Sequence, residues 1–182
     1  MVLAALAALT LSAAGPALPR KAPEFVIESP NGKQTLLTSY RGKDVVLVFM
    51  FTDCPHCQKA APMLAHLQDE YSSKGVQFLG ATFNKDAKAN VDQFVRLFGV
   101  NFPCGFSNDK NIHEFLGLPI TIPLFVPMLT FIDRNGMIRA QHIITGDDDK
   151  DKPEKSFFND LEIGVRGELE KMLKLPATSA RK

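Results

Sequence analysis

A strongly apolar run leads directly into two closely spaced cysteines, and this junction constrains the chain more than any other stretch. Residues 45–51 read Val-Val-Leu-Val-Phe-Met-Phe, a composition that predicts a buried central strand. Residues 58–67 follow with a helical pattern. Cys54 therefore falls where a strand ends and a helix begins, and Pro55 suits the first helical position, where its missing N–H costs nothing.

This position predicts a reactive sulfur at Cys54. Free backbone N–H groups and the positive end of the helix dipole stabilise a thiolate there, and a protonated His56 would add to the effect. Cys57 lies three residues further on, so both sulfurs share one helix face and can close a disulfide with little strain. We expect Cys54 to attack and Cys57 to resolve the mixed disulfide that results.

Two other uses of the cysteine pair stay open at this point. A structural zinc site needs about four protein ligands. The sequence has no second C-x-x-C or C-x-x-H, so Cys104 and His113 would have to complete such a site. The pair could also form an inert structural disulfide. Cys104 itself is expected to behave as a small buried apolar residue, with a third redox thiol or a dimer link as the alternative.

The motifs around the pair resemble the thioredoxin-fold family, in particular its extracytoplasmic TlpA/ResA-like branch. The resemblance covers about residues 22–173 and rests on Tyr40-Arg41-Gly42-Lys43, the apolar strand, the Cys-x-x-Cys pair, Pro62 and Val126-Pro127. The Pro-His dipeptide between the cysteines is instead similar to that of DsbA-type disulfide oxidases. The resemblance implies that Pro127 is a cis-proline facing the cysteine pair. It also implies that Val126 offers its backbone to an extended substrate segment.

The alternation of strand and helix patterns predicts an α/β protein with a thioredoxin-like fold, in which helices flank a central mixed sheet. Asn31-Gly32 between two apolar runs predicts an N-terminal hairpin. A strand near 102–106, followed by a short helix, forms the predicted βα insertion. We expect one thioredoxin-like domain at 22–175, after a signal-like segment and linker at 1–21 and before a polar tail at 176–182.

The C-terminal third of the chain predicts a second group of elements. An extended loop is expected at 117–127, strands at 128–133 and 137–144, and a last helix from Ser156. The charged loop at 146–153 contains an Asp cluster, but it lacks the ligand pattern of an EF-hand. A solvated loop is therefore the better interpretation than a calcium site.

The first residues predict the compartment. Residues 1–14 are apolar and carry no charge, which resembles the core of a secretory signal, with a plain Ala/Leu tail as the alternative. The stretch is shorter than the roughly 20 apolar residues of a membrane span. We expect an exported, extracytoplasmic protein, such as one in the bacterial periplasm, with a membrane anchor as the lesser option. The net charge of +1 argues against a nucleic-acid partner.

The resemblance also has two departures that bear on mechanism. Thioredoxins and DsbA-type proteins place an acidic residue where this chain has Val48, and TlpA/ResA-like proteins place Glu where it has Ala60. Such a carboxylate would take the proton from the second thiol. Without it, water, the substrate or Lys59 would have to accept that proton.

The predicted function is a thiol–disulfide oxidoreductase that exchanges disulfides with exported proteins, acting as a monomer with a membrane redox partner and no cofactor or metal. The predicted catalytic residues are Cys54, Cys57, His56, Pro55 and Pro127, and the substrate-binding residues are Val126 and Pro127. Two alternatives remain. One is a peroxiredoxin-like peroxidase, because Thr52 precedes Cys54, and the other is a copper-binding chaperone, because thiolates suit Cu(I).

Overall fold

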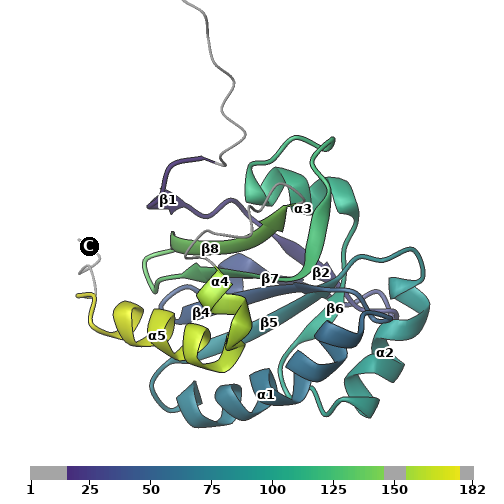
Figure 1. Ribbon diagram of the computed structural model, residues 1–182, viewed down its shortest axis with the longest axis horizontal. Helices are drawn as coiled ribbons and strands as arrows, with labels where there is room; N and C mark the ends of the chain where they lie inside the picture. Colours follow the sequence, from purple (N-terminus) through teal and green to yellow (C-terminus); the bar gives the residue numbers. More distant parts are fainter. Residues whose placement is uncertain (1–15, 146–154, 177–182) are drawn as a thin grey trace, which may run out of the picture.

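The computed structural model describes residues 16–145 and 155–176, whose strands form one mixed sheet of eight strands (Figure 1). The strands are β1 (Arg20–Lys21), β2 (Val26–Glu28), β3 (Gln34–Leu36), β4 (Asp44–Met50), β5 (Val76–Thr82), β6 (Cys104–Phe106), β7 (Leu124–Ile132) and β8 (Met137–Thr145). The helices are α1 (Pro55–Ser72), α2 (Ala87–Leu97), α3 (Asp109–Leu116), α4 (Lys155–Asn159) and α5 (Leu161–Leu173), with a 3-10 turn, η1, at Leu37–Tyr40.

Strand β4 lies near the middle of the sheet, whose order is β1-β8-β7-β4-β5-β6-β2-β3. It pairs in parallel with β5 and antiparallel with β7. All seven of its residues are buried, since helices cover both faces of the sheet. Helices α1 and α5 lie on one face and α3 lies on the other (Figure 1). The continuous apolar run at 45–51 therefore predicted a central strand correctly.

The two faces of the sheet carry separate cores. Successive side chains of a strand point to opposite faces. The α1-face core contains Val46, Val48 and Met50 of β4 together with Cys57, Leu64, Phe78, Phe131 and Val165. The α3-face core contains Val45, Leu47 and Phe49 of β4 together with Phe25, Leu79, Phe115 and Met128. The rings of Phe25, Phe49 and Phe115 pack edge to face or tilted, with centroids 5.2–5.8 Å apart.

The predicted N-terminal hairpin and βα insertion are both present. Strands β2 and β3 pair antiparallel around Gly32, whose φ of 85° requires a residue without a Cβ. The hairpin joins the sheet through one pair, Glu28 with Phe106 of β6. Strand β6 runs parallel to β5 and is followed by α3, so the insertion extends the central sheet.

Three boundaries differ from the sequence analysis. Arg20 and Lys21, assigned there to a linker, form β1 because they pair with the edge of β8. Strand β7 begins at Leu124 rather than at residue 128, since Leu124 and Phe125 pair with the end of β8. The last helix is divided into α4 and α5 at Asp160, whose carboxylate accepts a hydrogen bond from the Ile163 N–H at 3.1 Å.

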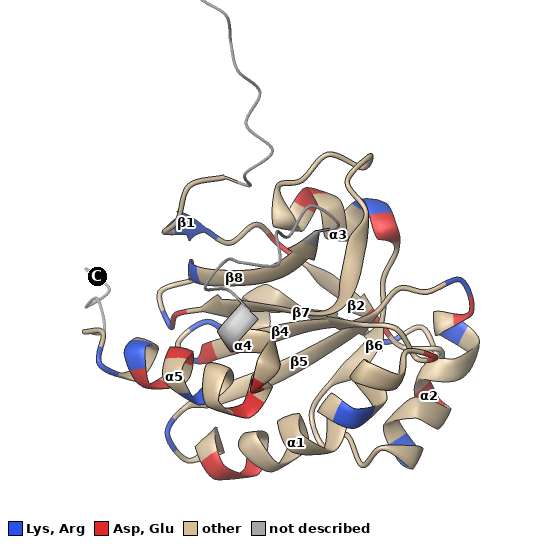
Figure 2. Cartoon of the chain, in the orientation of Figure 1, with Lys and Arg blue, Asp and Glu red and all other residues tan. Residues whose placement is uncertain are grey.

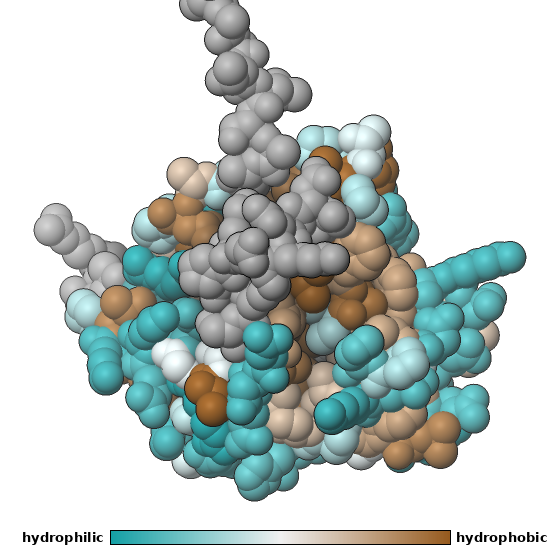
Figure 3. Space-filling model, in the orientation of Figure 1, coloured by the Kyte–Doolittle hydropathy of each residue, from teal (hydrophilic) through white to brown (hydrophobic). Residues whose placement is uncertain are grey.

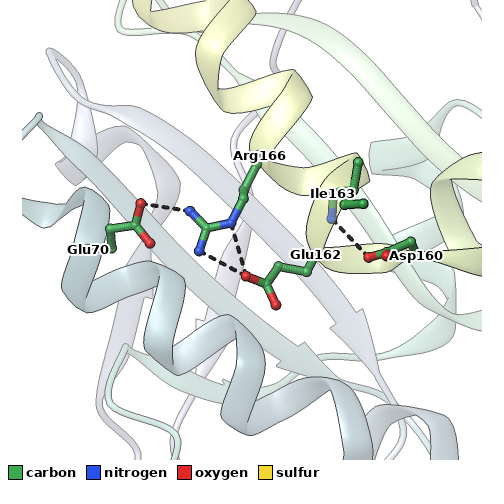
Figure 4. Close-up of polar contacts among 5 residues, drawn as sticks. All are labelled: Glu70, Asp160, Glu162, Ile163 and Arg166. Atoms are coloured by element: carbon green, nitrogen blue, oxygen red, sulfur yellow. Dashed lines mark hydrogen bonds and ion pairs between the residues drawn. The ribbon is translucent and has the colours of Figure 1, made fainter.

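Charged residues lie mostly on the helices and loops, while the strands at the centre of the sheet are largely uncharged (Figure 2). One surface cluster joins α5 to α1: the Arg166 guanidinium contacts Glu70 at 2.7 Å and Glu162 at 2.9 Å (Figure 4). The signal-like residues 1–14, the charged loop at 146–153 and most of the polar tail lie outside the described residues. Among the helices that are described, none has the length and apolar character to cross a membrane.

Candidate active site

Residues 51–54 form the turn that joins the end of β4 to the start of α1, as the sequence predicts. Cys54 is the N-cap of α1, its backbone is extended, and Pro55 begins the helix. The backbone carbonyl of Cys54 accepts from the N–H of Gln58 at 3.0 Å. The half-buried Cys54 side chain therefore sits where the first N–H groups of the helix have no carbonyl of their own. These N–H groups form the positive end of the helix dipole, beside Cys54.

A small polar network fixes this turn. The Thr52 N–H donates to the Asn84 Oδ1 at 3.0 Å, and the Asn84 amide donates to the Thr52 hydroxyl at 2.9 Å. The Gln58 side-chain amide donates to the Thr52 carbonyl at 3.0 Å. Asn84 is not among the site residues predicted from the sequence. The sequence did contain a signal for this contact, because Thr52 and Asn84 both follow the carboxyl ends of neighbouring parallel strands, β4 and β5.

The Val126-Pro127 segment lies directly opposite Cys54. The peptide bond between these residues is cis, as the resemblance implies. The Cys54 thiol donates to the Val126 carbonyl, with Sγ and O 3.8 Å apart. Antiparallel pairing of β4 and β7 produces this contact between residues 72 positions apart, because Phe49 faces Met128 just inside the sheet. The structure thus brings Cys54, Val126 and Pro127 together.

Cys57 differs from Cys54 in being completely buried. Burial raises the pKa of the Cys57 thiol far above its ordinary value, and the negative charges of Cys54 and Asp53 act in the same direction. A hydrogen bond with the Phe51 backbone acts in the opposite direction but is outweighed. Cys57 is therefore a neutral thiol in the reduced protein. It must lose a proton before it can attack a mixed disulfide.

Cys57 has no carboxylate at positions 48 and 60, where the resembled families carry an acidic residue. Val48 and Ala60 are both buried and belong to the same α1-face core as Cys57. Asp53, His56 and Lys59 are all exposed. A proton that leaves Cys57 must therefore be accepted from outside this apolar core.

The exposed side of the turn is formed by Asp53, Pro55 and His56. Asp53, the residue before Cys54, is exposed. His56 occupies the second position of α1 and presents its ring to solvent beside Cys54. Any protein that reaches the Cys54 sulfur must approach from the side on which these residues lie.

Cys104 and His113 do not join the cysteine pair. The Cys104 residue is partly exposed, yet its sulfur packs so closely on Gly80 that a Cβ there would lie 2.7 Å away, and burial raises its pKa to about 12. The buried His113 ring bonds the carbonyls of Asp109 and Ile122 at 2.9 Å each. Residues 16–145 and 155–176 contain no group of three or more His, Cys, Asp or Glu side chains placed to hold a metal ion. The zinc site considered from sequence is therefore not assembled.

Comparisons with known proteins agree on the family of this chain. The family model described as Redoxin matches residues 19–161. The thiol-disulfide oxidoreductase ResA of Geobacillus thermodenitrificans is 34% identical over 125 residues, which are 69% of this chain and 67% of that protein. ResA of Bacillus subtilis is 35% identical over 103 residues, 55% of this chain and 57% of that protein.

Solved structures agree on the fold. A thiol:disulfide interchange protein of the thioredoxin family from Chlorobium tepidum is 25% identical and superposes with a TM-score of 0.62, covering 85% of this chain and 99% of that one. The predicted thioredoxin-like α/β fold is thus confirmed. The relatives favour disulfide exchange over the peroxidase and copper-chaperone alternatives. The chain belongs to the Redoxin family, as a ResA-like thiol-disulfide oxidoreductase of the thioredoxin fold.

Proposed function

We propose that the protein exchanges disulfides with exported proteins through Cys54 and Cys57, in an active site that works like the Cys-Pro-His-Cys site of DsbA-type oxidases. The observation that supports this best is the contrast between the two sulfurs. Cys54 is half-buried at a helix N-terminus, 3.8 Å from the Val126 carbonyl, whereas Cys57 is fully buried behind it. Such an asymmetry suits one attacking and one resolving thiol.

In the reducing direction, the Cys54 thiolate attacks one sulfur of a substrate disulfide, and the other substrate sulfur leaves as a thiolate. Cys57 then loses its proton to solvent or substrate and attacks the Cys54 sulfur. The second substrate thiolate departs, the Cys54–Cys57 disulfide forms, and two electrons have passed to the substrate. The reverse sequence oxidises a substrate dithiol. Val126 and Pro127 would hold the substrate backbone beside Cys54 during either sequence.

We place this activity outside the cytoplasm, where disulfides persist, and propose that the protein is a monomer that exchanges electrons with a membrane redox protein. The apolar, uncharged residues 1–14 support export, with retention as an anchor the lesser possibility. The membrane partner would restore the Cys54–Cys57 pair after each turnover. Fusion of residues 1–21 to a reporter that is active only after export tests this localisation. A reporter that stays in the cytoplasm would contradict it.

Turnover of insulin or a scrambled ribonuclease tests the chemistry. Cys54→Ser should abolish disulfide exchange, while Cys57→Ser should retain the first attack and accumulate a covalent mixed disulfide visible on a non-reducing gel. Cys104→Ser is the matched control, because Cys104 belongs to β6 and not to the turn that carries the pair, and it should exchange at the wild-type rate. Full activity of Cys54→Ser would refute the assignment of Cys54 as the attacking sulfur.

A further inference from the structure

The start of β7 presents a large apolar side chain beside the reactive sulfur. Phe125 is 49% exposed, although it lies within a strand. It immediately precedes Val126, whose carbonyl contacts the Cys54 sulfur at 3.8 Å. The sequence contains no charged residue between Glu114 and Asp133. On the β7 side, the reactive thiol therefore borders a segment without charged residues, in which Phe125 is an exposed strand residue.

The pleat of β7 places Phe125 on the same face of the sheet as the cysteines. Its neighbour Leu124 packs against the α3-face core, so Phe125 points to the opposite face, which α1 covers. Cys54 packs against the core of that same face. The cross-strand partner of Phe125 is Ile144 of β8, which is partly exposed. We call the Phe125–Ile144 pair the Phe125 subsite. Figure 3 shows apolar surface in the middle of this view, beside the N-terminal part of α1.

The segment that leads into this subsite is held in place. The His113 ring, only 4% exposed, contacts the Ile122 carbonyl at 2.9 Å. The Ile122 N–H in turn donates to the Pro119 carbonyl at 3.0 Å. The loop before β7 is thus fixed by α3 on one side and by its own turn on the other. A surface fixed in this way loses little conformational entropy when a partner packs on it, which favours binding.

The geometry of the sheet indicates what packs there. The β4–β7 pairing begins at Met128, so residues 124–126 extend beyond the end of β4 in the described sheet. A second copy of this chain would need an interface of about 1,200 Å² or more, far beyond what two side chains supply. A substrate segment needs much less, because its bond to Cys54 holds it in place. In an extended segment, every second side chain faces the sheet surface that carries Phe125.

We propose that the Phe125 subsite selects substrate segments that carry an apolar residue within two positions of the reacting cysteine. The proposal rests on the function proposed above and specifies its substrate class. An apolar side chain gains by leaving water against Phe125 and Ile144. A charged side chain at the same place loses hydration and meets no charged partner on β7, because residues 115–132 carry none.

Short peptides with one cysteine test this selection. Each peptide has a Gly-rich background with a single Leu, Glu or Lys placed one or two positions before or after the cysteine, which is joined by a disulfide to 5-thio-2-nitrobenzoate. The reduced protein passes two electrons to this disulfide, ends as the Cys54–Cys57 disulfide, and releases the peptide thiol and one coloured thiolate. The measured quantity is kcat/KM for each peptide, expressed as a ratio to that of the all-Gly peptide.

At one or more of these positions, we expect the wild-type protein to prefer Leu over both Glu and Lys by about tenfold. Phe125→Ala should reduce this ratio to near one. Phe125→Glu should reverse it toward Lys, an outcome that loss of folding could not produce. Ile163→Ala is the matched control, since Ile163 is 68% exposed on α5, and it should keep the wild-type ratio.

Equal rates for Leu, Glu and Lys peptides at every position would overturn the subsite and leave the proposed function intact. A preference for Leu that Phe125→Ala and Ile163→Ala preserve alike would also overturn it. Failure of the wild-type protein to release the coloured thiolate from any peptide would instead refute the proposed function, and the subsite with it.

Discussion

Complete burial of Cys57 leads to a specific prediction about the second half of the reaction. The resolving step requires the Cys57 thiolate, and burial is the largest cause of the raised pKa of this thiol. Repulsion from Cys54 disappears once Cys54 is bonded to substrate, but burial persists. The pKa of Cys57 should therefore stay above the accessible pH range in the mixed disulfide as well.

The expected magnitude follows from the thiolate fraction. Below the pKa, the ionised fraction rises about tenfold per pH unit, so the resolving rate should rise about a thousandfold between about pH 6 and about pH 9. The profile should be a straight line of unit slope in log rate, with no plateau. The physical reason is that the described surroundings of Cys57 contain Val48 and Ala60, both buried, where a carboxylate could have served as a base.

Stopped-flow release of 5-thio-2-nitrobenzoate from its mixed disulfide with Cys54 measures this step alone. The protein should carry Cys104→Ala, so that a third thiol neither reacts nor is labelled. Cys57→Ser in the same background is the control and should release the coloured thiolate no faster than buffer does. A wild-type profile that levels off at or below about pH 8 would refute the argument, because it would reveal a base or an ionised thiol that the burial excludes.

Ala60→Glu provides the complementary test. Position 60 lies one helical turn after Cys57 on the same face of α1, so a carboxylate there can reach the thiol. We expect the resolving rate near neutral pH to rise about a hundredfold, the lower end of general-base catalysis, and the profile to bend into a plateau. Circular dichroism would establish that the variant is folded. A folded variant with the wild-type rate and slope would show that proton removal does not limit the resolving step.

Three further predictions concern stability and redox poise. Burial raises the pKa of the Cys104 thiol to about 12 in the folded protein, above its unfolded value. Its contribution to stability is therefore complete below about pH 8.5 and is lost as pH rises toward 12, by about 1.4 kcal/mol per pH unit. In urea unfolding, the free energy of unfolding of Cys104→Ala should decline less steeply with pH than that of the wild type. Asp44→Ala should cost about 3–5 kcal/mol in the free energy of unfolding, since this buried carboxylate accepts from Arg134 at 2.6 Å. Glu70→Gln, which removes one carboxylate from the surface pair with Arg166, should cost clearly less, because solvent screens this pair. Equal losses for the two variants would contradict this ranking. The reduction potential of the Cys54–Cys57 pair, measured in glutathione buffers, should lie between about −270 and about −120 mV. It should become more negative in His56→Pro. An unchanged potential would show that His56 does not tune the site.

Local patterns predicted a large part of the structure. The run at 45–51 is apolar on both faces, so it could only be a central strand, and the turn after it had to start a helix at Pro55. Gly32 after Asn31 predicted the hairpin because a positive φ is needed there. Each of these features depends on residues within a few positions of one another, which is why a local sequence pattern could predict it.

The contacts that complete the site depend on sheet pairing. Thr52 and Asn84 meet because β4 and β5 are parallel neighbours, and nothing in either local sequence specifies that hydrogen bond. The start of β7 at Leu124 was missed because three prolines at 119, 123 and 127 favour an irregular loop, while pairing with β8 imposes a strand. The Phe125 subsite was missed for the same reason.

Local sequence is enough to place Cys54 at the cap of a helix and Cys57 on the same helix face, because the two cysteines are three residues apart at a strand–helix junction. The difference in burial between the two thiols comes from tertiary packing. Cys57 faces the α1-face core and is sealed from solvent, while Cys54 remains half-buried opposite Val126. Burial depends on what packs against a residue from distant parts of the chain, and a local pattern does not contain that information.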